Sequence, residues 1–216
     1  MTLAIALITA GLPFAAIYLI FDNGNSLLSP ASSALGILSL LFACFVLGSI
    51  LSQAFWVWMS NRLGKVSALI FGLFIYVILL IAIFLSLPSA EIMIIAMLFI
   101  IAGMTNGAYQ QIPWAIYPDL MDMTREASGD AIEGAFSAIW LFGQKVANAI
   151  APLILSLILA VFGWKESSSG FTDQMPEALW ALQNSITILP AFILVLAIVG
   201  LFYFSRYLKK YQPIES

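Results

Sequence analysis

A single lysine inside a long apolar stretch is the first residue of this sequence that points to chemistry. Lys145 lies between Gln144 and Asn148, and residues 134–162 contain no other charged side chain. A charge near the centre of a lipid bilayer costs about 2.5–3.5 kcal/mol on insertion scales, so such a side chain usually meets water, a ligand or an ionic partner. We therefore predict that Lys145 is functional; a structural ion pair or hydrogen bond is the alternative.

Helical spacing gathers polar side chains around this lysine. The residues at i, i+4, i+7 and i+11 of one helix face are Ser137, Leu141, Gln144 and Asn148. Lys145 precedes Asn148 by three residues, so Gln144, Lys145 and Asn148 are predicted to converge on one polar cavity. Amides and an ammonium group suit a ligand rich in hydroxyl groups, because each hydroxyl both donates and accepts a hydrogen bond. Hydrogen bonding between helices, worth about 0.6 kcal/mol on average in membranes, is the alternative for the two amides.

A second group of polar and aromatic residues is predicted to form the facing wall of the cavity. At i, i+4, i+7 and i+8 of another helix stand Asn106, Gln110, Pro113 and Trp114. Pro113 lacks a backbone N–H and is predicted to kink or end this helix. Trp114 is predicted to stack on a ligand ring, and anchoring at the membrane interface is its alternative role. Tyr109 falls on a different face and stays outside the predicted site.

Charged residues cluster in the stretch that follows this wall. Asp119, Asp122 and Arg125 stand close together there. Paired carboxylates can perform acid–base chemistry, but no nucleophile and no metal-ligand set accompanies them, so we predict that the protein is not an enzyme. We expect this group, with Arg62 in an earlier turn, to act as a gate by forming ion pairs. A plain solvated loop is the alternative.

The composition places these residues in a membrane protein. Of the 216 residues, 62% are hydrophobic and 9% are charged, whereas soluble domains have about 45–50% and about 25%. The chain has no histidine and one cysteine, Cys44, which excludes disulfide frameworks, paired-cysteine redox motifs and histidine-built metal sites. The net charge of −3 provides no basic excess for nucleic acid. We therefore expect no cofactor and no nucleic-acid partner.

Apolar runs long enough to cross a membrane dominate the sequence. A helix needs about 20 apolar residues to span a hydrocarbon core of about 30 Å. Six runs meet this length, separated by turns at residues 22–25, 61–65, 88–89 and 167–170. We predict an all-α membrane domain over residues 1–216 with six transmembrane helices, at about residues 2–21, 33–56, 66–87, 92–117, 132–162 and 182–207.

Polar residues are spread unevenly over the six predicted helices. The third and the sixth are the most uniformly apolar and are predicted to face lipid, whereas the other four carry polar side chains at mid-length. Two triplets that each end in a peripheral helix form a three-plus-three layout, as in secondary transporters. No internal sequence repeat is strong enough to establish this layout.

The basic residues predict the orientation in the membrane. Cytoplasmic loops are enriched in lysine and arginine. One set of turns and ends carries six of the basic residues: Arg62, Lys65, Arg125, Arg206, Lys209 and Lys210. Only Lys165 belongs to the other set. We therefore predict that both termini are cytoplasmic.

Two motifs resemble those of a known transporter family. The turn Asn61-Arg62-Leu63-Gly64-Lys65 resembles the loop motif of the major facilitator superfamily, although Asn61 replaces the usual Asp. The longer match begins with Pro113-Trp114 and Pro118-Asp119 and continues through Glu133-Gly134, Phe136, Trp140, Phe142 and Lys145. It resembles the glycoside-pentoside-hexuronide:cation symporters, the melibiose-permease-like branch of that superfamily. Asp130 and Ala131 depart from the basic residues common in its loop.

The resemblance implies a fold and a function. The chain would correspond to helices seven to twelve of a twelve-helix transporter, the carboxy-terminal half. Its partners would be the lipid bilayer, a small-molecule substrate such as a sugar, and an amino-terminal six-helix half or a second copy. A coupling ion, H⁺ or Na⁺, would bind mainly outside this chain. Lys145 would contact sugar hydroxyls or communicate with the cation site, and the membrane would be the bacterial inner membrane.

Two alternatives to sugar symport stay open. The first is a carrier of a lysolipid, a nucleoside or a drug, and a lipid substrate would require an apolar side opening between helices. The second is a six-helix membrane protein that does not transport. Such a protein would be structural or regulatory, or the inert fragment of an interrupted gene.

Overall fold

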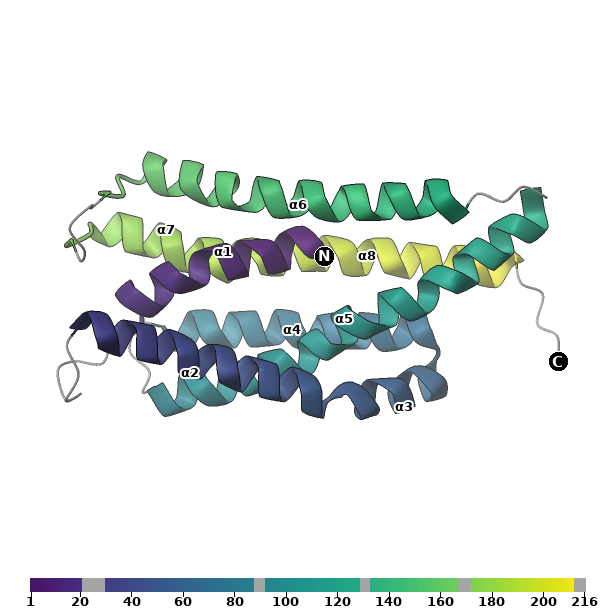
Figure 1. Cartoon of the computed structure of the whole chain (residues 1–216), viewed down its shortest axis with the longest axis horizontal. Coiled ribbons are helices and arrows are strands. Elements are labelled where there is room, and N and C mark those ends of the chain that lie inside the picture. Colours follow the sequence, from purple (N-terminus) through teal and green to yellow (C-terminus); the bar gives the residue numbers. More distant parts are fainter. Residues whose placement is uncertain (21–29, 88–91, 129–132, 167–171, 212–216) are drawn as a thin grey trace.

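The computed structural model describes residues 1–20, 30–87, 92–128, 133–166 and 172–211, and all its regular elements in these ranges are helices (Figure 1). In chain order they are α1 (Thr2–Tyr18), α2 (Pro30–Leu51), α3 (Gln53–Leu63), α4 (Lys65–Ser86), α5 (Ile92–Ser128), α6 (Glu133–Val161), α7 (Pro176–Ile186) and α8 (Ile188–Tyr211). The predicted turns at residues 22–25, 88–89 and 167–170 lie outside the described residues.

Four helical stretches of the described chain are long and apolar enough to cross a membrane: Lys65–Ser86, Met93–Arg125, Gly134–Val161 and Pro176–Arg206. A fifth span results if α2 and α3 are counted together, since they meet at a bend of 44°. The apolar helix α1, with 17 residues, is shorter than a full span. The all-helical membrane architecture is therefore confirmed, and the sixth crossing and the three-plus-three repeat stay predictions.

The helices form an elongated bundle. In Figure 1, α6 runs along one edge, α1 and the α7–α8 span lie next to it, and α2 and α3 form the opposite edge. The long helix α5 crosses the bundle diagonally and packs against α2 and α4, whereas α1 packs against α6, α7 and α8. The start of α1 lies near the middle of the bundle (Figure 1). This arrangement places α1, α5 and α6 around a common space.

Glycines allow α2 and α5 to pack with their backbones in contact. A Cβ atom at Gly103 would overlap the carbonyl oxygen of Phe45, and one at Gly48 would overlap that of Ile100. Small residues bring helices together in this way inside membranes, where packing replaces the hydrophobic effect as the driving force. Nearby, the indole of Trp56 donates a hydrogen bond of 2.6 Å to the Met104 carbonyl.

The second predicted span is not one helix, which corrects the prediction over residues 33–56. The chain bends at Ser52, between α2 and α3. The Ser52 hydroxyl and the Gln53 amide both donate to the carbonyl of Ser49, at 3.0 and 3.1 Å. Hydroxyl groups that bond to a carbonyl one turn earlier bend helices. The apolar pattern extends through this point, so hydropathy alone could not show the bend.

The fourth span is longer than predicted. We expected Pro113 to kink or end a helix that stops near residue 117. The helix does not end there, since α5 runs through Pro113 and Pro118 to Ser128. Each proline removes a single N–H donor, and the neighbouring turns keep their hydrogen bonds. At 1.5 Å per residue, 37 residues span about 55 Å, more than a hydrocarbon core of about 30 Å. The charged end of α5 is therefore helical and extends beyond that core.

The two helices predicted to face lipid each carry a row of exposed apolar residues along one side, and their contact with lipid stays a prediction. On α4 the exposed row is Phe71, Phe74, Ile78, Ile81 and Leu85, and on α8 it includes Phe192, Val195, Val199 and Phe202. The other side of α4 is buried, and α4 packs against α8. The Gln183 amide joins the two spans by donating to the carbonyls of Phe84 and Leu87, at 2.7 and 3.1 Å. The last span begins earlier than predicted, at Pro176, and is interrupted at Thr187.

Candidate functional site

A polar cavity of about 460 Å³ lies between α1, α5 and α6. Its lining residues are Thr2, Ile5, Ala6, Thr9 and Ala10 of α1, Tyr109, Gln110 and Trp114 of α5, and Gln144, Asn148 and Pro152 of α6. Sites for small molecules typically measure about 300–1,000 Å³ and combine an apolar wall with a few polar groups. The cavity therefore has the size and lining of a small-molecule site.

Four residues predicted from the sequence line this cavity together. Gln110 and Trp114 form the wall on α5, and Gln144 and Asn148 form the wall on α6. Two of the three amide side chains belong to α6 and one to α5, so a ligand between the two helices would meet donors and acceptors from both sides. The predicted opposition of these two helix faces agrees with the cavity found in the structure.

The cavity wall differs from the prediction in two ways: α1 contributes to it, and so does Tyr109, which was predicted to lie outside the site. Thr2 and Thr9 line the cavity from α1, and the Tyr109 hydroxyl donates a hydrogen bond of 3.0 Å to the Thr2 hydroxyl. The predicted site used only the face of α5 that carries Gln110 and Trp114. Because α1 packs beside this face, Tyr109 on the adjoining face also lines the cavity. The sequence offered one indication of this contribution, since Thr9 is a polar residue within the first apolar run.

The structure does not place Lys145 in the cavity, which corrects the predicted convergence with Gln144 and Asn148. Its side chain is exposed and is not part of the lining. Successive residues of a helix are rotated by about 100°, so Lys145 points to the flank of α6 when Gln144 points inward. Lys145 shares that flank with Pro152, seven residues later, which borders the cavity. The lysine therefore lies on the side of α6 next to the cavity.

Asn106 also lies outside the cavity, although it was predicted to line it. Its side chain is 2% exposed, and its Oδ1 atom has no hydrogen-bond partner among the described residues. Gln111 Oε1 and Trp140 Nε1 are also buried without a hydrogen-bond partner among the described residues. A buried polar atom without a partner costs about 1–3 kcal/mol, so these three atoms are places where a ligand or water would be stabilised.

An aromatic cluster on α5 and α6 closes one end of the cavity. The ring centroids of Trp114 and Trp140 are 6.1 Å apart, and Tyr117 lies 5.7 Å from Trp140 and 6.0 Å from Phe136. The Tyr117 hydroxyl donates a hydrogen bond of 2.6 Å to the Ser137 hydroxyl. These contacts hold the start of α6 against α5.

A second aromatic cluster holds the other end of α6. Gly163 has φ +75° and follows the helix, and the N–H groups of Gly163 and Trp164 donate to the carbonyls of Ala160 and Leu159. This is a Schellman motif, in which a left-handed glycine ends a helix. It turns Trp164 toward α1, where its ring lies 5.7 Å from Phe14 and 5.0 Å from Tyr18 in edge-on geometry.

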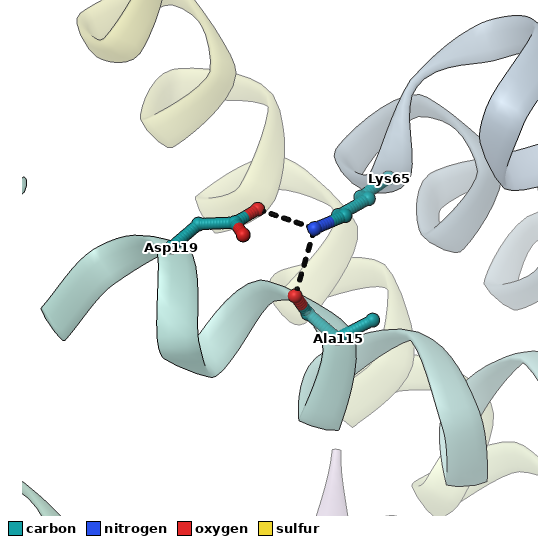
Figure 2. A network of polar contacts seen from close by, with 3 residues as sticks. All are labelled: Lys65, Ala115 and Asp119. Carbon is teal, nitrogen blue, oxygen red and sulfur yellow. Dashed lines mark hydrogen bonds and ion pairs between the residues drawn. The ribbon is translucent and has the colours of Figure 1, made fainter. Parts of the chain in front are cut away.

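The predicted gate residues lie at the charged end of the bundle, and Asp119 has a partner within the chain. Figure 2 shows the Lys65 ammonium between the Asp119 carboxylate, at 2.6 Å, and the Ala115 carbonyl, at 3.0 Å. The side chains of Lys65 and Asp119 are 39% and 54% exposed, so their pairing contributes about 0–1 kcal/mol.

The remaining gate residues are exposed at this end. Arg62 stacks over the Trp58 ring at 5.4 Å. Asp122 and Arg125 belong to the helical end of α5, so the solvated loop that was the alternative to a gate is not what the structure shows there. Within the described residues there is no group of three or more cysteine, aspartate or glutamate side chains that could hold a metal ion.

Comparisons with known proteins agree with the resemblance seen in the motifs. A family model described as "MFS/sugar transport protein" matches residues 31–207. An uncharacterized symporter, YnaJ, of Bacillus subtilis is 30% identical over 152 residues, which make up 69% of this chain and 31% of that protein. The sodium-dependent lysophosphatidylcholine symporter 1 of Xenopus tropicalis is 25% identical over 156 residues, 71% of this chain and 29% of that protein.

A third relative is the glucuronide carrier protein homolog of Escherichia coli, 26% identical over 114 residues, which are 53% of this chain and 24% of that protein. The chain thus spans less than a third of the length of these relatives. Symporters and carriers are transport proteins and not enzymes. The family match and the apolar helices together identify an integral membrane protein of the MFS/sugar transport family, in the branch of glycoside-pentoside-hexuronide:cation symporters and their relatives.

Proposed function

We propose that this chain is the carboxy-terminal half of a secondary active transporter that carries a sugar or glycoside together with a cation by alternating access. The observation that supports it most is the cavity of about 460 Å³ between α1, α5 and α6, lined by three amides, three hydroxyl groups and an indole. Such groups match the alternating donors and acceptors of a sugar. In transporters of this type the site lies near mid-membrane, and rocking of the two halves exposes it to either side.

In this proposal, the cavity residues have separate roles. Gln110, Gln144 and Asn148 hydrogen-bond substrate hydroxyls, and Trp114 stacks on the sugar ring. Asn106, which lies outside the cavity lining, keeps its predicted substrate role only if the cavity rearranges around its unpartnered oxygen. Lys145 reaches substrate or the cation site from the flank of α6, facing the other half of the transporter. The coupling ion, H⁺ or Na⁺, binds mainly in that other half, which is an amino-terminal six-helix unit or a second copy.

The charged end of the bundle acts as the gate in this mechanism. The pair of Lys65 and Asp119 holds α4 to α5. Asp122, Arg125 and Arg62 lie at the same end, where they would form ion pairs with the other half when the cavity closes on that side. We place this end, where α8 also ends, in the cytoplasm and the protein in a bacterial inner membrane; the start of α1 lies near the middle of the bundle instead (Figure 1). The concentration of basic residues at this end supports the orientation.

Uptake of radiolabelled sugars by the complete gene product in proteoliposomes tests the proposal. We expect uptake against a gradient that depends on Na⁺ or on a proton gradient. The matched control is the Gln144→Leu Asn148→Leu double variant, which removes two amides from the cavity wall and should lose uptake while still inserting into the membrane. Absence of uptake for every sugar and glycoside tested, by a protein shown to be folded, would contradict sugar transport.

A second candidate is the transport of a lysolipid, and one structural feature favours it. An apolar cavity of about 650 Å³ lies between α1 and α2, lined among others by Leu12, Phe42 and Val46. Thr9 lines both this cavity and the polar one, so the two are neighbours through a single residue. A polar headgroup and an acyl chain would fill such a pair, and the relatives named lysophosphatidylcholine symporters fit this candidate.

Competition separates the two candidates. If the substrate is a sugar, unlabelled sugars should inhibit uptake and lysophosphatidylcholine should not. The reverse result, together with loss of uptake when Phe42 is replaced by Asp in the apolar cavity, would establish the lipid candidate.

A further inference from the structure

Trp140 has a buried donor that faces no acceptor. Its indole Nε1 atom is shielded from solvent and has no hydrogen-bond partner among the described residues. The ring packs between Trp114 and Tyr117, at centroid distances of 6.1 and 5.7 Å. Buried indole N–H groups normally find an acceptor, so this one marks a position where an oxygen atom is missing from the packing.

A recess of about 50 Å³ lies next to this indole. Thr2, Tyr109, Gln110, Trp114 and Gln144 line both the recess and the polar cavity, so the recess is an inner extension of that cavity. A water molecule occupies about 30 Å³ in the liquid. The recess therefore accommodates one or two small polar groups, such as a ring hydroxyl or a hydroxymethyl group of a larger molecule in the cavity.

The groups around the recess select the chemistry of its occupant. Trp140 offers a donor only, whereas the amides of Gln110 and Gln144 offer both donors and acceptors. A hydroxyl group accepts from the indole and donates to an amide oxygen, and so satisfies both. The polar side chains that line the recess are the hydroxyl groups of Thr2 and Tyr109 and the amides of Gln110 and Gln144, and Met1 also belongs to the lining, together with the aromatic residues.

We propose that this recess is a hydroxyl-binding subsite and that Trp140 is a specificity-determining residue, which donates its indole N–H to one hydroxyl oxygen of the substrate sugar. The inference rests on the sugar-transport function proposed above and adds to it the residue that recognises one hydroxyl group of the substrate.

The test combines a Trp140→Phe variant of the complete gene product with a series of monodeoxy sugars. Phenylalanine retains the aromatic packing and removes the N–H donor. For the parent sugar we expect the KM of uptake to rise by about three- to tenfold, the equivalent of one hydrogen bond. For a single deoxy analogue, the one that lacks the hydroxyl in the recess, wild type and variant should have the same KM. For every other deoxy analogue, the KM of the variant should exceed that of the wild type by the same factor as for the parent sugar.

Two comparisons keep this test specific. Gln144→Leu, on the recess wall, should lose discrimination at the same deoxy position. Trp164→Phe removes an indole from the aromatic cluster at the other end of α6, which does not line the cavity, and should leave every KM unchanged. Because each result is a ratio between sugars within one variant, the amount of inserted protein does not affect it.

The possible failures are distinguishable. If wild-type protein transports sugars but Trp140→Phe affects all analogues equally, or none of them, the hydroxyl-binding subsite is overturned while sugar transport stands. If wild-type protein transports no sugar, the proposed function fails first and the subsite fails with it.

Discussion

Gln144 and Asn148 illustrate how α6 keeps amide side chains within an apolar helix. Both side chains border the cavity, whereas Phe142, Val146 and Ile150 occupy the exposed face. An amide in lipid without partners would be costly, but one that borders a cavity exchanges hydrogen bonds with water until a substrate replaces it. Their position on α6 thus makes them available to a ligand.

Removal of either amide should weaken substrate binding more than it weakens the fold. For Gln144→Leu or Asn148→Leu we expect the KM of uptake to rise by about 5- to 100-fold, because a substrate hydroxyl left without a partner costs about 1–3 kcal/mol. The measurement is concentration-dependent uptake in proteoliposomes. Ser156→Ala is the control on the same helix, since Ser156 bonds to its own helix, at the Pro152 carbonyl, and its loss should leave KM unaltered. Equal KM values for wild type and both leucine variants would contradict the assignment of the cavity.

Lys145 gives the second prediction at this scale. It lies at mid-helix on the flank of α6, beside the cavity and among exposed apolar residues. Lys145→Met should strongly reduce substrate accumulation without loss of membrane insertion, because the ammonium group is needed at the junction with the other half. Lys165→Met, which changes an exposed lysine beyond the end of α6, should retain accumulation. Wild-type accumulation by Lys145→Met would refute a transport role for this lysine.

The spacing of the amides predicted the two cavity walls on α5 and α6 because a helix repeats its faces regularly. It did not separate Gln144 from Lys145, since neighbouring residues differ by about 100° and both remain close to the polar side. Trp140 was part of the family motif but was not assigned to the site, because an aromatic residue in an apolar run usually serves packing. Only the structure shows that its nitrogen is buried without an acceptor.

At the scale of elements, the contact between α2 and α5 depends on the absence of side chains. Gly103→Ala would place a Cβ atom against the Phe45 carbonyl oxygen, a backbone atom that cannot rotate away. We expect a loss of about 1–3 kcal/mol in the free energy of unfolding, as for other overpacked sites. Thermal unfolding in detergent measures it. Gly200→Ala is the matched control, since nothing lies within 4 Å of the added atom, and a comparable loss there would contradict the argument.

The elements themselves were largely predictable, because continuous apolar runs allow few alternatives in a membrane. The boundaries of α4 and α6 lie within a residue or so of the prediction. The bend at Ser52 and the passage of α5 through Pro113 were not predictable. Both depend on which carbonyl groups lose or gain a hydrogen bond, and hydropathy contains no information about that.

The whole molecule carries its basic residues mainly at one end. Asn61, in the last turn of α3, and Glu166, after the end of α6, are exposed. These two helix ends lie at opposite ends of the bundle (Figure 1). After Cys44→Ser, a cysteine introduced by Asn61→Cys should react with a membrane-impermeant maleimide only from the cytoplasmic side, and one introduced by Glu166→Cys only from the outside. Labelling of both positions from the same side would contradict the predicted orientation.

The two aromatic clusters at the ends of α6 have a consequence for how this helix can change. Trp140 and Trp164 are fixed to different neighbours, one to α5 and the other to α1. One residue inserted between them would rotate one cluster against the other by about 100° and shift it by about 1.5 Å along the axis. Substitutions within α6 leave this register intact, whereas an insertion or deletion breaks one attachment whatever residue is involved. The length of this segment is therefore constrained more strictly than its composition.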